Sequence, residues 1–213
     1  MLSLQVTTVA TVIILPFGLL ASWLLAKTEI RGKALLDAVF SLPLVVPPVA
    51  TGYVLLWLLG RNGPIGGFLH DRLSWDIPFT WFAASLAAAV VSFPLMVKSM
   101  EVAMSAVDPR LERAARTLGA GPWRVFFTVT LPLSIRGVVG GVLLAFARGL
   151  GEFGATIVLA GNIPGKTQTV PLAIFTRLQV GDDAAAWRLV GYSVAVAFVA
   201  LLLQRRLIKR TAV

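Results

Sequence analysis

One pair of opposite charges, Arg148 and Glu152, interrupts an otherwise apolar stretch between residues 137 and 161. Residues four apart share one face of a helix, so the two side chains are expected to pair. In a membrane, such a pair is a candidate functional site, because a charge there normally faces protein or water. Arg148 could be an electropositive step for an anion, or the pair could be an ionic clasp between helices. We favour the clasp, because an exposed cation would hold an anion rather than release it.

Small residues recur at every fourth position beside this pair. They are Gly137, Gly141, Ala145 and Gly149. Such spacing lets two helices approach closely, so we expect this face to pack against another helix.

Other site chemistry is missing from the sequence. There are no cysteines, which excludes thiolate metal sites, and the single histidine, His70, has no ligand-type neighbours at a suitable spacing. No Gly-rich phosphate-binding motif and no Ser/His/Asp set occurs. The sequence therefore predicts no catalytic residue, no metal site and no cofactor in this chain.

The composition indicates a membrane protein. Of 213 residues, 57% are hydrophobic and 14% are charged, against about 45–50% and about 25% in soluble domains. Charge-free runs at 1–26, 38–60 and 77–97 each reach the roughly 20 residues that cross a bilayer. We expect an all-α, polytopic protein, a single domain over 1–213 with five transmembrane helices. The spans lie at about 4–26, 38–60, 77–97, 137–161 and 187–204.

The net charge of +9 does not by itself indicate a nucleic-acid partner, because the positions of the cations along the chain set the orientation instead. Thirteen Lys and Arg residues lie in loop 27–37, loop 98–136 and the tail after 204, and five in segments 61–76 and 162–188. Cations are retained in the cytoplasm, so the N-terminus is expected outside and the C-terminus inside. Because the first cation is Lys27, the first span is a retained helix rather than a signal peptide. The basic tail, Arg205 to Arg210, is interpreted as a topology anchor, with binding to lipid head groups as the alternative.

The remaining segments have local signatures. Pro43, Pro47 and Pro48 should kink or break the second span. Segment 61–78 is rich in turn formers and is expected to be a short exposed loop. Residues 170–180 could form a short helix that dips back into the protein and lines a cavity.

Loop 98–136 is longer than a connection needs and contains helix signals. Asp108-Pro109 is typical of an N-cap and first helical position, and Gly119 of a C-terminal stop. An apolar stripe is formed by Leu111, Ala114, Ala115 and Leu118. A helix this short needs a partner surface. Periodicity leaves two alternatives open: it packs on its own bundle or on lipid head groups, or it docks into a groove of a soluble protein.

The same residues resemble a known motif. Residues 112–119, followed by Leu131-Pro132, resemble the EAA loop of permease subunits of binding-protein-dependent ABC importers. Two alanines precede a glycine by five and four residues, and a Leu-Pro pair follows it. The matching residues are Ala114, Ala115, Gly119, Leu131 and Pro132. The usual glutamate position is Arg113, with Glu112 displaced by one residue. Residues 146–156, 161–167 and 42–49 are similar to molybdate, tungstate and sulfate permeases.

This resemblance implies a pore-forming permease subunit, not an enzyme, of an ATP-driven importer of molybdate or tungstate in the inner membrane. Sulfate or another oxyanion is the alternative. It also implies a second permease copy, an external oxyanion-binding protein, and two cytoplasmic ATPase subunits that grip the 108–121 helices and hold ATP and Mg²⁺. The rival class, a stand-alone secondary transporter or channel, is disfavoured because no repeat or membrane proton relay is visible. A membrane-embedded enzyme lacks any candidate catalytic group.

Overall fold

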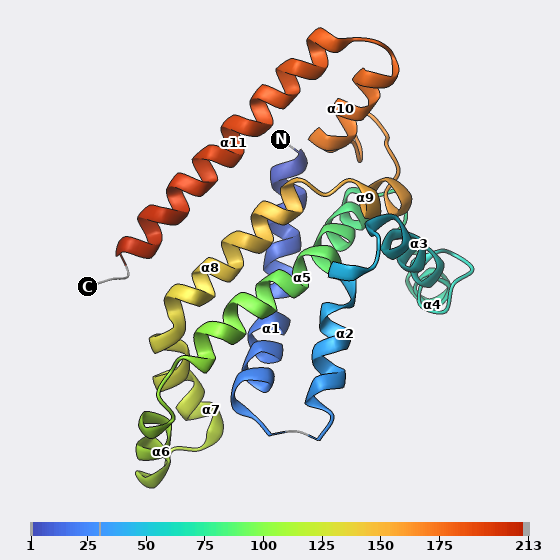
Figure 1. Ribbon diagram of the computed structural model, residues 1–213. Coiled ribbons are helices and arrows are strands. Elements are labelled where there is room, and N and C mark those ends of the chain that lie inside the picture. Colours follow the sequence, from blue (N-terminus) through green and yellow to red (C-terminus); the bar gives the residue numbers. More distant parts are fainter. Residues whose placement is uncertain (1, 30, 211–213) are drawn as a thin grey trace.

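A computed structural model describes residues 2–29 and 31–210, with side chains except at 200, 201 and 203–210. Every regular element in this part of the chain is a helix (Figure 1). In order, they are α1 (Leu2–Lys27), α2 (Lys33–Val45), α3 (Pro48–Leu59), α4 (Gly66–Leu73), α5 (Trp81–Ser105), α6 (Pro109–Thr117), α7 (Pro122–Val125), the π-helix η1 (Phe126–Thr130), α8 (Leu131–Leu150), α9 (Gly154–Leu159), α10 (Val170–Gln179) and α11 (Asp183–Arg210). The predicted all-α fold class is confirmed.

Helices α1, α5 and α8 pack on one another and form the core of the molecule. In the most apolar part of α5, 61% of the residues are buried, against 39% in α1 and 33% in the 122–150 helix, so α5 is central. Alanines at 83, 84 and 87–89 are fully buried and let its neighbours approach. Hydroxyls on these helices donate to carbonyls one turn back, as Thr7 does to Ser3 at 2.8 Å, which satisfies them away from water.

The second predicted span is broken, as its prolines indicate. The chain bends by 110° between α2 and α3. Val46 is extended, with φ −71° and ψ 134°, and Pro48 is the first residue of α3. A residue that precedes proline is pushed out of the helical region, and proline has no N–H to donate, so the turn falls here.

The fourth predicted span, 137–161, is wrong as a single helix. Residues 122–150 form one long apolar helix, and after Leu150 the chain turns before the short α9 begins at Gly154. Three helices in the described part are long and apolar enough to cross a membrane, and the bent α2–α3 pair counts either as a fourth span or as a re-entrant loop. The fifth predicted span, 187–204, lies within the longer α11 and includes residues 200, 201, 203 and 204, whose side chains are not described, so it stays a prediction. Length and composition therefore support the first, third and fourth predicted spans, and the second passes the same test only as a bent pair.

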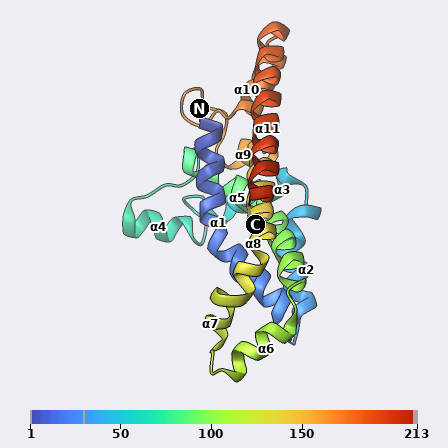
Figure 2. The same cartoon turned by 90° about the vertical axis from the view of Figure 1, so that its left-hand side faces the viewer.

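The short elements lie at opposite ends of the bundle. Helices α6 and α7 lie at one end with the turn between α1 and α2, and α10 lies at the other end near the start of α1 (Figures 1 and 2). The expectation of a loop over 61–78 is wrong in part, because α4 forms there. The short helix expected over 170–180 is present as α10, with Leu172 buried. The basic tail side chains of Arg205, Arg206, Lys209 and Arg210 lie outside the described side chains.

Candidate functional site

Local sequence signals form and end α6. The Asp108 carboxylate accepts the Arg110 N–H at 2.8 Å, and Pro109 occupies the first position, where its missing N–H costs nothing. Gly119 has φ +84°, and the N–H of Ala120 donates to the carbonyl of Ala115 at 3.1 Å. This left-handed residue and its hydrogen bond stop the helix. The helix predicted between Asp108 and Gly119 is therefore present.

The apolar stripe of α6 faces away from the bundle. Leu111 is 49% exposed and Leu118 is 89% exposed. Ala114 is exposed and Ala115 is half-buried. The alternative in which this stripe packs on the protein's own helices is wrong. Exposed arginines flank the stripe, at positions 110, 113 and 116.

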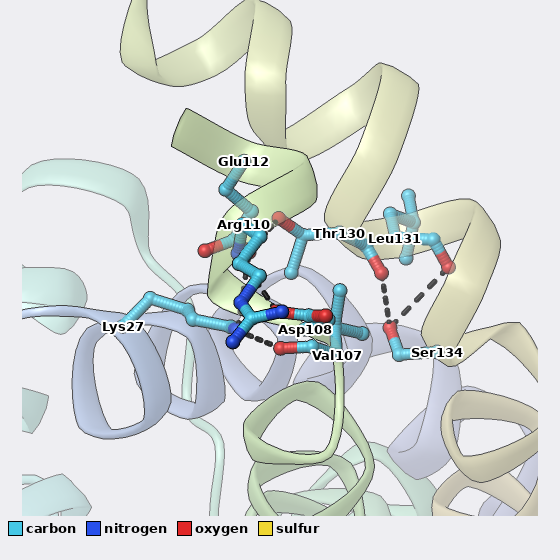
Figure 3. Close-up of polar contacts among 8 residues, drawn as sticks. All are labelled: Lys27, Val107, Asp108, Arg110, Glu112, Thr130, Leu131 and Ser134. Atoms are coloured by element: carbon cyan, nitrogen blue, oxygen red, sulfur yellow. Dashed lines mark hydrogen bonds and ion pairs between the residues drawn. The ribbon is translucent and has the colours of Figure 1, made fainter. Parts of the chain in front are cut away.

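The inward face of α6 carries Glu112, which is buried (Figure 3). Its Oε1 lies 3.2 Å from the Lys27 ammonium at the end of α1, and accepts the Thr130 hydroxyl of η1 at 2.7 Å. Lys27 also donates to the Val107 carbonyl, just before α6, at 2.9 Å. Glu112, which sequence reasoning grouped with the docking residues, therefore binds the protein's own bundle. The sequence did not predict Lys27 or Thr130 as partners of Glu112, since nothing in the spacing links residues so far apart.

Leu131 and Pro132, the distal part of the motif, do not lie on α6. They begin α8 directly after the π-helix, and the N–H of Leu131 donates to the carbonyl of Phe126 five residues earlier. Pro132 has no N–H, so the change from π-helical to α-helical pairing falls where one hydrogen bond is missing anyway.

The Arg148–Glu152 pair lies where α8 ends. The Arg148 Nη1–Glu152 Oε2 distance is 2.8 Å, and the Glu152 side chain is 2% exposed against 31% for Arg148. The other carboxylate oxygen accepts the N–H of Ala155 at 2.8 Å, in the first turn of α9. Since α8 ends at Leu150, Glu152 lies past the helix, and the pair joins the end of α8 to the start of α9.

The face of small residues on α8 packs against α5 and α1. A β-carbon on Gly137 would lie 2.0 Å from that of Ala103, and one on Gly141 would lie 3.0 Å from the backbone oxygen of Met96. A β-carbon on Gly149 would lie 2.9 Å from the Thr7 side chain of α1. Ala145, in the same row, is fully buried. A larger side chain in this row would therefore separate the helices.

Two cavities lie away from α6. One of about 340 Å³ is lined by residues of α1, α8, α10 and α11, including Ala147, Leu150 and Tyr192. Another, of about 580 Å³, is lined by the end of α3 and by loop residues that include Arg61 and Asp76. Neither lining includes Arg148 or Glu152. Among the described residues, no group of three or more His, Cys, Asp or Glu side chains is arranged to hold a metal ion.

Comparison with known proteins gives a family match over residues 7–213, to the inner membrane component of binding-protein-dependent transport systems. The chain is 53% identical over 204 residues to the molybdenum transport system permease protein ModB of Escherichia coli K12, covering 95% of this chain and 89% of that protein. It is 40% identical to the putative molybdenum transport system permease protein YvgM of Bacillus subtilis, covering 94% and 88%. The sulfate transport system permease protein CysW of Synechocystis is 37% identical, covering 98% and 77%.

Solved structures share the fold. A chain of the MetNI methionine ABC transporter, in an inward-facing conformation, has a TM-score of 0.76 and 16% identity, covering 99% of this chain and 93% of that one. A chain of a bacterial alginate ABC transporter, in complex with an alginate-bound periplasmic protein, has a TM-score of 0.78 and 17% identity, covering 98% and 76%. With the family match and the apolar helices, this likeness identifies a multi-pass membrane protein.

Proposed function

Because the chain belongs to the family of inner membrane components of binding-protein-dependent transport systems, we propose that it is the permease subunit of an ATP-driven molybdate or tungstate importer. The relatives named for molybdenum are 53% and 40% identical to it, and the sulfate permease CysW is 37% identical. This ranking supports molybdate or tungstate over sulfate. The chain is a transport subunit rather than an enzyme, and residues 1–213 act as one transmembrane domain.

The observation that carries the proposal is the exposed apolar face of α6. Leu118 is 89% exposed and Leu111 is 49% exposed on a short helix with buried contacts on its opposite face. An apolar stripe held outward on a helix fits a groove in a protein partner. We assign this partner to a cytoplasmic ATPase subunit, two of which hold ATP and Mg²⁺ in the complete transporter. Exposed Arg113 and Arg116 flank the contact.

The other partners and the orientation follow from this assignment. Helix α6 lies in the cytoplasm, so the opposite end of the bundle, with α10, faces the external oxyanion-binding protein (Figure 1). The N-terminus then lies outside and the C-terminus inside, in agreement with the distribution of Lys and Arg. A second copy of this chain completes the path. Closure of the ATPase dimer draws the two α6 helices together and reopens the path outward by rigid-body motion.

We assign the Arg148–Glu152 pair to a clasp between α8 and α9 rather than to the anion path. The carboxylate is almost fully buried and binds both Arg148 and the first turn of α9, so it holds the turn between the two helices.

Uptake of radioactive molybdate into proteoliposomes tests the function. The vesicles contain this chain with its partner ATPase subunit, and the partner oxyanion-binding protein is added outside. We expect ATP-dependent molybdate uptake that unlabelled tungstate suppresses and sulfate at equal concentration does not. Suppression by sulfate alone would reassign the substrate, and uptake without ATP or ATPase would favour a stand-alone transporter.

A further inference from the structure

Three segments that are far apart in the chain meet at the inward face of α6. They are the last turn of α1, the entry and first turn of α6, and the end of η1 (Figure 3). The Lys27 ammonium contacts the Val107 carbonyl and the Glu112 carboxylate, and the same carboxylate oxygen accepts the Thr130 hydroxyl. One buried oxygen of Glu112 is thus shared by α1 and η1.

These contacts are sheltered from water. The side chains of Lys27 and Glu112 are 8% and 9% exposed, and Thr130 is 1% exposed. A buried charge that loses its partner is strongly unfavourable, and hydrogen bonds in a low dielectric are strengthened. A movement of α6 that separated these groups would therefore be resisted, and α6 should carry its neighbours with it.

An aromatic contact runs beside the ionic one. Trp23 lies one turn before Lys27 on the same face of α1, and its ring centroid is 5.2 Å from that of Trp123 in α7. The Trp23 and Phe126 rings are in edge contact at 5.6 Å. The end of α1 is thus joined to α7 and η1 by aromatic packing and to α6 by charge, while the Thr130 hydroxyl joins α6 to η1.

The position of Thr130 matters because it ends the π-helix. Wide π-helical turns inside a longer helix are frequent at functional sites. Here the π-helical segment separates α7 from the long α8, and α8 carries the row of small residues packed on α5. The Thr130 hydroxyl therefore holds α6 to the point where the 122–150 helix changes its hydrogen-bonding pattern.

We propose that Lys27, Glu112 and Thr130 are positioning residues that transmit movement of α6 to the ends of α1 and α8. The proposal rests on the function given above, in which the outward face of α6 docks on the ATPase. The outward face of α6 receives the movement of the ATPase, and Glu112 on the inward face passes this movement to Lys27 and Thr130. Loss of this link should uncouple ATP hydrolysis from transport while ATPase docking persists.

A matched pair of variants in η1 tests the link. Thr130→Val removes the hydroxyl with little change in shape, Thr130→Ser keeps it, and Thr128→Val is the control. Thr128 lies in the same π-helix, exposed, and its hydroxyl donates to the Arg124 carbonyl rather than to α6. In the reconstituted transporter, three quantities are measured: ATPase subunits that copurify, ATP hydrolysis, and oxyanion uptake per ATP.

We expect Thr130→Val to keep its ATPase subunits, and its uptake per ATP to fall about tenfold or more. A lost hydrogen bond to a charged group costs enough free energy to account for such a factor. Thr130→Ser and Thr128→Val should retain the wild-type ratio. An unchanged ratio in Thr130→Val would overturn the proposal. If Thr130→Val yields no complex, the same three quantities are measured for Glu112→Gln. This variant keeps an acceptor for Thr130 but removes the charge facing Lys27.

A wild-type ratio in Glu112→Gln, or loss of both complexes while Thr130→Ser assembles normally, would mean that the network only supports folding. Either result overturns the positioning role. A wild-type complex that takes up no oxyanion at all would instead refute the proposed function, so the two failures are distinguishable.

Discussion

Replacing Arg148 with methionine is expected to destabilise the protein more than replacing Glu152 with glutamine. The carboxylate is 2% exposed and the guanidinium-bearing side chain is 31% exposed, at a separation of 2.8 Å. The second carboxylate oxygen accepts the N–H of Ala155. Each single variant therefore leaves behind a partner in a different environment: a buried anion in one case and a partly exposed cation in the other.

The magnitudes follow from these environments. Breaking a buried ion pair on one side costs about 3–5 kcal/mol. In Arg148→Met the carboxylate keeps one neutral backbone donor, so we expect the lower end, about 3 kcal/mol. In Glu152→Gln the amide oxygen still accepts from Ala155 and the guanidinium is partly exposed rather than buried, so about 1–2 kcal/mol is expected. The double variant removes both charges and should regain most of the larger loss.

A double-mutant cycle measures this coupling. Thermal unfolding of the detergent-extracted complex reports stability, and molybdate uptake per complex reports function. A clasp predicts that stability and uptake both recover in the double variant. If the double variant regains stability but not uptake per complex, the cation itself is the working part and the reasoning for a clasp is refuted.

Gly119→Asp should leave the complex in the membrane but uncouple oxyanion uptake from ATP hydrolysis, because Gly119 has φ +84° and a carboxylate is unfavourable at a helix C-terminus. Intact uptake together with intact ATPase association would contradict the docking assignment. A reporter fused after Val213 should be active only in the cytoplasm, and one inserted in 162–170 only outside; the reverse activities would invert the topology. Gly137→Val should cost about 1–3 kcal/mol by overpacking and lower the yield of folded protein, since its β-carbon would lie 2.0 Å from an α5 side chain. Gly140→Ala is the control, because a β-carbon at Gly140 would lie 3.9 Å from its nearest neighbouring atom, in the Ser99 side chain. Equal yields of the two variants would refute the packing argument.

The α6 helix was predictable because its signals are local. Asp108 and Pro109 start it, and Gly119 ends it, through hydrogen bonds that span at most five residues. The break between α2 and α3 was predictable for the same reason, since a proline restricts its own backbone and that of its neighbour.

The end of α8 was not predictable from hydropathy. An apolar run through residue 161 is compatible with one helix or with two, and the choice depends on what surrounds the break. Here Glu152 binds Arg148 on one side and caps the first turn of α9 on the other, which makes the turn after Leu150 favourable. The segment 61–78 shows the same limit, since its turn formers concealed the short α4.

Composition and order alone determine that this chain is a helical membrane protein, since long charge-free runs must bury their backbone polar groups in helices. They also determine that a capped, amphipathic helix interrupts the loop 98–136. They do not determine which face of that helix is buried. In the structure the apolar stripe points outward and Glu112 points inward, because Lys27 and Thr130 supply its partners. A charge is buried where opposite charge and donors converge, and that convergence arises only when distant segments pack together.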